Sequence, residues 1–422
     1  MKTLIRGGTV VTMDPATGDF PEGDVLVEDG RIAAVGTRIE ADGAEVVDAA
    51  GMIVAPGFVD THRHTWQTAF RGLGTDWTFD EYRAILHGRI RPHYRPDDVY
   101  LGNLFGRIEA LNAGVTTMLD WFHCSDRPEN ADAAVQALQE APGRSIFCYG
   151  AGNGADADIT AEITRIRAQL PGEAMALGLR GPILTTMDTT AADVALAREH
   201  GLRVSVHIHG TAGWPRGDRP VAEMRERGLL DDRMTVVHGN GLSDDQLAML
   251  ADAGCSVSIS PDVEVKMGFG APITGRVLAA GIRPSLSVDD CPSAGGDLFS
   301  AMRTALAVQR GLDGTLTTRD VAEFATIDGA RTCGLGDRTG SLTVGKDADL
   351  IVLDAQDPAL FPVNDPVAGI VTAGHPGVVD SVFVAGKAVK RHGRLLGLDL
   401  PRLRTRLLES RDRIAAAAGL GG

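Results

Sequence analysis

Two histidines one residue apart, His62 and His64, end a short apolar stretch that begins near Pro56. Side chains two residues apart on a β-strand point to the same face, so both imidazoles can reach one object together. Neutral imidazole is a common ligand for zinc and related divalent metals. Taken alone, the pair fits a polar strand cap as well as it fits a metal site, so further ligands must decide between the two interpretations.

Three more residues of ligand type each follow a stretch that is typical of a β-strand: His207, His238 and Asp289. The parallel strands of a (β/α)8 barrel all end on one rim, where such barrels hold their active sites. Structural histidines would instead be scattered over helices and loops. The pattern therefore predicts a metal site that is built from strand ends.

The middle of the chain supplies the strands that such a rim needs. Residues 56–335 alternate strand-like and helix-like stretches, as βα units around a parallel sheet do. Eight strands are predicted: one ending at His62, then 115–119, 145–148, 175–179, 203–206, 234–237, 255–259 and 283–288. We therefore expect an α/β fold with a (β/α)8 TIM barrel over residues 56–335.

The two ends of the chain differ from the middle. Residues 1–55 and 336–399 contain short β-type stretches broken by turn residues, such as Asp29-Gly30 between two alternating stretches. Neither end is large enough to bury a core alone, so we expect both to pair into one small β-sandwich beside the barrel. Residues 400–422 are predicted to form a C-terminal helix.

Composition limits the partners. A formal net charge of −15 argues against nucleic acid and anionic membranes, which favour basic surfaces. The sequence has no apolar run of about 18 residues and no signal-peptide pattern at its start. Its five cysteines form no CxxC pair, which is typical of reduced thiols. We therefore expect a cytoplasmic protein with a small-molecule substrate and with neither a nucleic-acid nor a membrane partner.

Longer motifs point to a family. They are the stretch 56–64, followed by Gln67 and Arg71-Gly72, and the β-type stretch 340–353. With these the chain resembles the amidohydrolase superfamily over essentially its whole length. The resemblance is to the branch that includes the triazine hydrolases, cytosine deaminase and guanine deaminase.

The resemblance implies a barrel with one divalent metal ion. The ligands would be the side chains at His62, His64, His207 and Asp289, with His238 beside them. Zinc is the expected metal, and iron or manganese are the alternatives. The family also suggests a homodimer or a larger homo-oligomer.

The sequence departs from the family pattern in the proton shuttle. Mononuclear deaminases carry a glutamate three residues after the histidine of strand five, and Gly210 stands there in this chain. In the loop after strand seven, Glu264 takes the place of a usual asparagine. The predicted strand 175–179 has no lysine to bridge two metals, which favours a single ion.

The expected reaction is hydrolytic removal of an amino group, or another ring substituent, from a nitrogen heterocycle by a metal-activated water. Asp289 is expected to act as the general base and His238 to polarise the bond or stabilise an oxyanion. We hypothesise that Glu264 is a relocated proton donor. The alternative is a rim residue that pairs with Lys266 or Arg276.

Substrate contacts are expected from Trp66, Gln67 and Trp77 in the first βα loop and from His123 after strand two. Core packing is the alternative for the tryptophans, and a solvent-facing loop position is the alternative for His123. Two other functions stay open from sequence. One is hydrolysis of a cyclic amide or ureide C–N bond, and the other is a metal-retaining binding protein without turnover.

Overall fold

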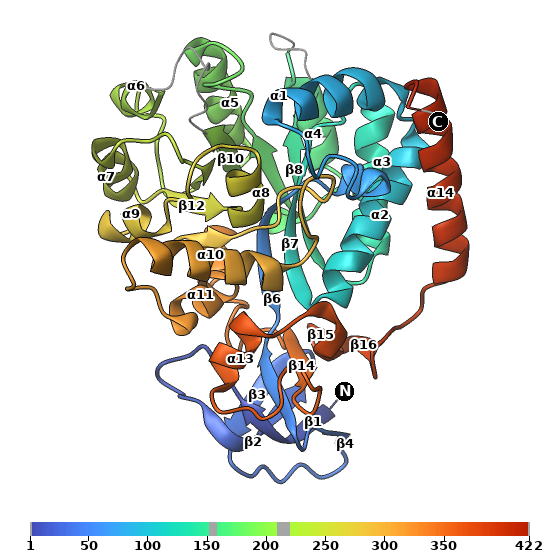
Figure 1. Ribbon diagram of the computed structural model, residues 1–422, viewed down its shortest axis with the longest axis vertical. Helices are drawn as coiled ribbons and strands as arrows, with labels where there is room; N and C mark the ends of the chain where they lie inside the picture. Colours follow the sequence, from blue (N-terminus) through green and yellow to red (C-terminus); the bar gives the residue numbers. More distant parts are fainter. Residues whose placement is uncertain (1, 152–157, 209–219, 421–422) are drawn as a thin grey trace.

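The computed structural model describes residues 2–151, 158–208 and 220–420, so Gly210 lies outside the described residues. Two sheets organise the chain (Figure 1). One is a parallel sheet of eight strands from the middle of the chain, and the other is a mixed sheet of nine strands from both ends. The predicted barrel with a β domain from both termini is confirmed.

The eight barrel strands follow one another in chain order around the sheet. They are β6 (Phe58–Arg63), β7 (Val115–Phe122), β8 (Arg144–Gly150), β9 (Met175–Gly178), β10 (Arg203–Ile208), β11 (Met234–His238), β12 (Ser256–Ile259) and β13 (Ser285–Leu286). Asp289 N donates to His62 O at 2.9 Å, and His64 N donates to Asp289 O at 2.8 Å. These two bonds bring the end of the last strand against the first, at the predicted rim.

Helices cover the outside of this sheet (Figure 1). They are α2 (Pro96–Asn112), α3 (Pro128–Glu140), α4 (Thr160–Arg167), α5 (Met187–Glu199), α6 (Pro220–Glu226), α7 (Asp244–Asp252), α8 (Pro261–Lys266), α9 (Thr274–Ala279), α10 (Leu298–Leu312), α11 (Thr318–Phe324) and α12 (Ile327–Thr332). A serine caps α7, because the Ser243 side chain accepts from Gln246 N at the start of this helix. No described helix is long and apolar enough to cross a bilayer.

The mixed sheet lies at one end of the molecule (Figure 1). Its strands are β1 (Lys2–Val10), β2 (Phe20–Glu28), β3 (Arg31–Gly36), β4 (Glu45–Asp48), β5 (Met52–Pro56), β14 (Leu350–Asp354), β15 (Val379–Val384), β16 (Lys387–Arg391) and β17 (Arg394–Leu395). β5 and β14 pair antiparallel and join the two halves of the sheet. Asp29 and Gly30 turn the β2–β3 hairpin, with left-handed φ angles of 48° and 83°.

Further along the chain are α13 (Pro366–Thr372) and α14 (Leu400–Ala417), and two short turns are η4 (Gly172–Ala174) and η5 (Pro376–Val378). α14 runs along α2 (Figure 1), and Leu400 and Leu403 lie against Leu104 and Ile108. All five cysteines are free and buried.

One segment between β6 and α2 sits on the barrel rim. It consists of η1 (Thr65–Phe70), α1 (Phe79–Tyr82), η2 (Arg83–Ile90) and η3 (Arg91–His93). η2 is a π-helical turn, a rare geometry that is often found at functional sites. Because several of its side chains face the rim, this segment forms part of the site described next.

Candidate active site

The predicted metal ligands converge at the rim. His62 Nε2 lies 3.1 Å from His207 Nε2 and 3.4 Å from Asp289 Oδ1, and His64 Nε2 lies 3.3 Å from Asp289 Oδ1. Donors about 2.1 Å from one tetrahedral zinc-type ion are separated from one another by about 3.4 Å. Among the described residues, these donors form two groups that each fit a divalent metal ion: His62, His64 and His207 in one, and His62, His238 and Asp289 in the other.

The protonation states of His62, His207 and Asp289 suit metal binding. The pKa of His64 is raised instead, because burial, which lowers it, is outweighed by the raising contacts, the hydrogen bond to Asp289 first among them. Burial lowers the pKa of His62 to about 4 and that of His207 well below its ordinary value, so both stay neutral near pH 7. Burial alone would raise the pKa of Asp289, but hydrogen bonds from His62 and His64 hold it well below its usual range. Neutral imidazole and ionised carboxylate are the forms that bind metals.

His64 has its ligating nitrogen selected by a backbone contact. Its Nδ1 lies 2.6 Å from Trp121 O, a carbonyl that can only accept, so Nδ1 carries a proton and Nε2 is the nitrogen that faces the ligand group. The Trp121 ring fills the space beside the histidines, with its centroid 4.5 Å from that of His207. Gly150 and Gly178 leave room for this ring, because a Cβ at either position would lie within 2.5 Å of it.

His238 lies beside the ligand group and is backed by a buried carboxylate. Its Nε2 is 3.6 Å from Asp289 Oδ2, and its Nδ1 is 3.1 Å from Glu264 Oε1. The same Glu264 oxygen accepts from Ser260 N at 2.8 Å, and Oε2 accepts from Asn240 Nδ2 at 3.2 Å. Glu264 is fully buried, and its contact with the site is through His238.

Two of these residues have an unusual backbone. His238 and Asp289 adopt left-handed φ angles of 73° and 67°. Such a conformation costs a non-glycine residue about 1–3 kcal/mol, and it persists where the surrounding structure enforces it. Both residues stand where a barrel strand ends, so the strained turn directs their side chains across the rim.

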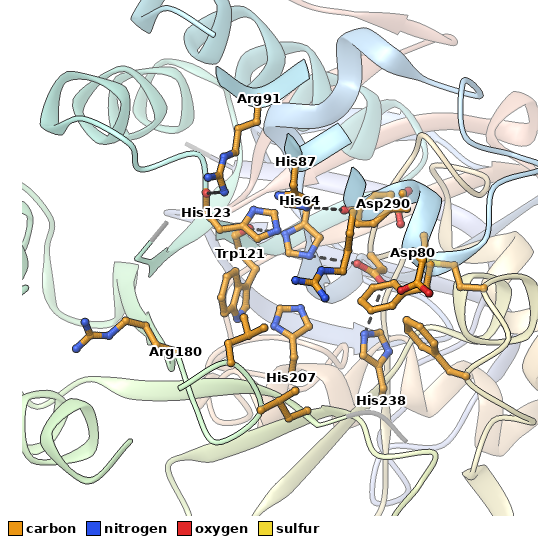
Figure 2. Close-up of a pocket in the computed structure, with 18 of the residues that line it drawn as sticks. His64, Asp80, His87, Arg91, Trp121, His123, Arg180, His207, His238 and Asp290 are labelled. Carbon is orange, nitrogen blue, oxygen red and sulfur yellow. Dashed lines mark hydrogen bonds and ion pairs between the residues drawn. The ribbon is translucent and has the colours of Figure 1, made fainter. Parts of the chain in front are cut away.

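A cavity of about 640 Å³ opens above the ligand group. Its described wall is made by His64, Phe79, Asp80, Tyr82, Arg83, Ala84, His87, Gly88, Arg91, Trp121, His123, Ala151, Leu179, Arg180, Gly181, Ile183, Leu184, Thr185, His207, His238, Met267, Phe269, Asp289 and Asp290. Figure 2 shows His123 next to His64, with Arg180 extending away from the histidines. Aromatic faces beside basic and acidic groups suit a flat, polar small molecule.

His123 lines this cavity as expected, whereas three other predicted substrate contacts are corrected by the structure. Trp66 and Gln67 have no exposed surface, because the 3-10 turn η1 directs both behind the described wall. Gln67 Nε2 donates to Tyr82 Oη at 2.6 Å, so it supports a wall residue instead. Trp77 also lies outside the described wall, with its ring against Gly74.

The position of Glu264 fits neither sequence hypothesis, the proton donor or the rim residue paired with Lys266 or Arg276. It is not among the described residues of the cavity wall, so it has no direct path to a bound ring. The alternative ion pairs are not formed either: Lys266 donates to Gly74 O, and Arg276 pairs with Asp244.

Sequence reasoning missed the wall that Tyr82, His87 and Arg91 provide. The sequence predicts only a loop between the first barrel strand and the helix that follows it. The spacing of Tyr82, His87 and Arg91, five and four positions apart, is a signal for a helical segment with one face toward the cavity. A π-helical turn places residues with this spacing on one face.

Comparisons with known proteins identify the family of this chain. The model of the Amidohydrolase family matches residues 53–389. The 5-methylthioadenosine/S-adenosylhomocysteine deaminase of Desulforudis audaxviator is 32% identical, over 94% of this chain and 96% of that protein. The 5'-deoxyadenosine deaminase of Methanothermobacter thermautotrophicus is 30% identical, over 90% of this chain and 91% of that protein.

Solved structures show the same fold. A zinc-bound adenosine deaminase from Xanthomonas campestris superposes with a TM-score of 0.87 at 24% identity, over 98% of both chains. A triazine hydrolase variant gives 0.87 at 22% identity, over 97% of this chain and 99% of the other. With a matching family model over most of its length and a rim of metal-type donors, the chain belongs to the amidohydrolase family and is a metal-dependent hydrolase of carbon–nitrogen bonds.

Proposed function

We propose that this hydrolase deaminates the 6-aminopurine base of an adenosine-type nucleoside, with a modified 5′ position accepted. The convergence of His62, His64, His207 and Asp289 beneath one cavity carries the hydrolytic part of the proposal. The names of the relatives above support the purine. The cavity of about 640 Å³ also exceeds the needs of a bare base and leaves room for a ribose and a substituent.

Zinc is the proposed ion, since the zinc-bound neighbour shares the fold and the donor set is of the nitrogen and oxygen type that zinc accepts. When bound, it supplies the Lewis acidity that lowers the pKa of a water toward neutrality. The side chains of His62, His64, His207 and Asp289 would hold it at the strand ends.

The two carboxylate oxygens of Asp289 face different neighbours. Oδ1 faces His62 and His64, whereas Oδ2 is the oxygen nearer to His238. Oδ2 can therefore take a proton from the attacking water while Oδ1 stays with the ligand group. Addition of water to the ring C=N bond places the developing negative charge on the ring nitrogen, while His238 Nε2 faces the attacking water and orients it.

The leaving nitrogen needs a proton to depart as ammonia. Asp289 holds the proton that it has taken and delivers it to that nitrogen, which leaves the carboxylate ready for another cycle. Glu264 contributes by fixing His238 from behind, because its oxygens are already engaged by His238, Ser260 and Asn240.

The test is ammonia release from a panel of compounds by the zinc-loaded protein. The panel holds adenosine, 5'-deoxyadenosine, 5-methylthioadenosine and S-adenosylhomocysteine, with guanine, cytosine, an aminotriazine and a cyclic ureide as comparisons. We expect the highest kcat/KM among the adenosine-type compounds. Turnover of the ureide alone would replace the proposal by cyclic amide hydrolysis, and tight binding without any turnover would favour a binding protein.

Three sequence predictions stay proposals beside this function. They are a homodimer or larger homo-oligomer, a cytoplasmic location, and a division into residues 1–55 with 336–399, 56–335 and 400–422. Light scattering on the purified protein measures the first, and limited proteolysis between the parts addresses the last.

A further inference from the structure

His123 is an imidazole of the cavity wall that lies directly against a metal ligand. Its ring stacks on that of His64, with the centroids 4.2 Å apart and the planes 11° apart. Arg91 Nη1 approaches the His123 carbonyl at 3.5 Å, and Arg91 itself is held by Asp126 at 3.0 Å. A group bound to the ring edge of His123 is therefore close to the reacting centre.

Trp66 determines which nitrogen of His123 carries the proton. Its Nε1 lies 2.9 Å from His123 Nδ1, and an indole nitrogen can only donate. His123 Nδ1 must therefore accept, so the neutral ring carries its hydrogen on Nε2. Trp66 is itself fixed, because Tyr94 Oη donates to Trp66 O at 3.0 Å and packs edge-on against the indole.

The Nε2 side of His123 faces the cavity. Among the described residues no group lies within hydrogen-bonding distance of this nitrogen, and it is not one of the enclosed unpaired atoms of the described chain. The ring is partly exposed, and the cavity is the space to which it is exposed. His123 thus presents its Nε2–H to the cavity, and reversing the tautomer would leave the Trp66 indole nitrogen buried without a partner.

We propose that His123 is a specificity-determining residue whose Nε2–H donates to a ring nitrogen of the substrate, and that Trp66 is the positioning residue that fixes this tautomer. This inference rests on the proposed deamination of an adenine-type ring. A ring with a lone pair at that edge is accepted. A ring with a C–H or N–H at the same edge is rejected, because two hydrogens would then meet.

The first experiment identifies the substrate ring nitrogen that accepts the hydrogen bond from His123. Adenosine is compared with 1-deaza-, 3-deaza- and 7-deazaadenosine, each of which replaces one ring nitrogen by C–H, as substrates and as competitive inhibitors. The His123→Phe variant keeps a flat ring against His64 but has no N–H. For one analogue, we expect the ratio of kcat/KM for adenosine to kcat/KM for the analogue to be about 10-fold larger in the wild type than in His123→Phe. One hydrogen bond is worth about this much. The preferences over the other two analogues stay unchanged.

A second variant tests the tautomer without changing His123. Trp66→Phe keeps an aromatic ring but lacks the indole N–H, so both neutral tautomers become accessible and the same preference falls partway. Tyr94→Phe is the matched control, since it removes a hydrogen bond from the same buried cluster without touching His123. It should leave the preference unchanged.

A readout independent of turnover follows the tautomer itself. Nitrogen-15 spectra of histidine-labelled protein, with the His123 signals assigned from His123→Phe, should show a protonated Nε2 in the wild type and in Tyr94→Phe. Trp66→Phe should show a mixture. Thermal unfolding of every variant records whether it is folded.

Three results overturn the inference. They are unchanged preferences in His123→Phe for all three analogues, an equal fall in all three, and a wild-type spectrum with the proton on Nδ1. If no adenosine-type compound binds or turns over in the wild type, the proposed function fails, while the spectra still decide the tautomer. If His123→Phe does not fold, Trp66→Phe and the spectra decide the outcome.

Discussion

Glu264 lies directly behind His238, with its Oε1 3.1 Å from His238 Nδ1, on the side of the ring that faces away from Asp289. A carboxylate at Nδ1 keeps the proton of His238 there and holds the ring in one orientation. The pair therefore links a buried acid on α8 to the reacting edge of the site.

Glu264→Gln tests this link. Partners that orient active-site imidazoles are worth about 10- to 100-fold, so kcat should fall by that factor with little change in KM. Steady-state kinetics with the best compound of the substrate panel give both values. Asp262→Asn, on the same short helix but bonded to Thr304, is the control and should keep its activity. Nearly full activity in Glu264→Gln would eliminate the role of Glu264.

Metal removal should abolish activity and lower stability. A ligand that binds only the folded state stabilises it by about 2.7 kcal/mol at a concentration of 100 times Kd. Dialysis against a chelator, followed by zinc, should lower and then restore both the ammonia release and the unfolding midpoint. His207→Ala should lose its zinc content in elemental analysis, whereas His392→Ala, at a largely exposed site, should not. Activity that survives metal removal with no bound metal would contradict the assigned site.

Asp290 should make the metal-free protein less stable as the pH rises. Burial, and then the charge of Asp289, raises its pKa from 3.8 to about 7. Between these values the folded protein binds more protons than the unfolded chain, so the free energy of unfolding decreases with increasing pH. Asp290→Asn should therefore raise the unfolding midpoint at pH 8 and change it little at pH 4. An equal shift at both pH values would show that ionisation is not the cause.

Gly178→Ala should disturb the ligands through Trp121. A Cβ at this position would lie 2.5 Å from the indole ring, which packs against His207. Overpacking of this kind costs about 1–3 kcal/mol, and displacing the ring also moves the carbonyl that orients His64. Chemical denaturation and zinc content measure the two effects. Gly172→Ala, where nothing lies within 4 Å, is the control, and equal stability of both variants would refute the packing argument.

The barrel and the meeting of the candidate ligands on one rim were predictable because they depend on local patterns. Apolar stretches that each ended in a polar residue gave all eight strands, and parallel strands must end on one rim. His62, His64, His207 and Asp289 therefore met as expected, although they are far apart in the sequence. The hairpin at Asp29-Gly30 followed from the same kind of local signal.

The side-chain directions around the rim were not predictable. Trp66 and Gln67 follow His64 closely, but a single 3-10 turn sends them behind the wall. Glu264 lies four residues after Ser260, and the short helix α8 folds it back onto the Ser260 backbone N–H. Such reversals depend on tertiary contacts with His238 and Tyr82, which no sequence period encodes.

The hydrogen bonds that close the barrel lie next to the candidate metal ligands. Thr61 donates to Leu286 O across 225 residues of chain, and the backbone bonds between Asp289 and the His62–His64 segment lie just beyond it. This seam joins the first and last strands, and a contact so distant in sequence forms late because a long loop must close first. The ligands from its two sides come together only when the seam is complete. A divalent ion bound by His62, His64 and Asp289 would therefore link the two sides of the seam.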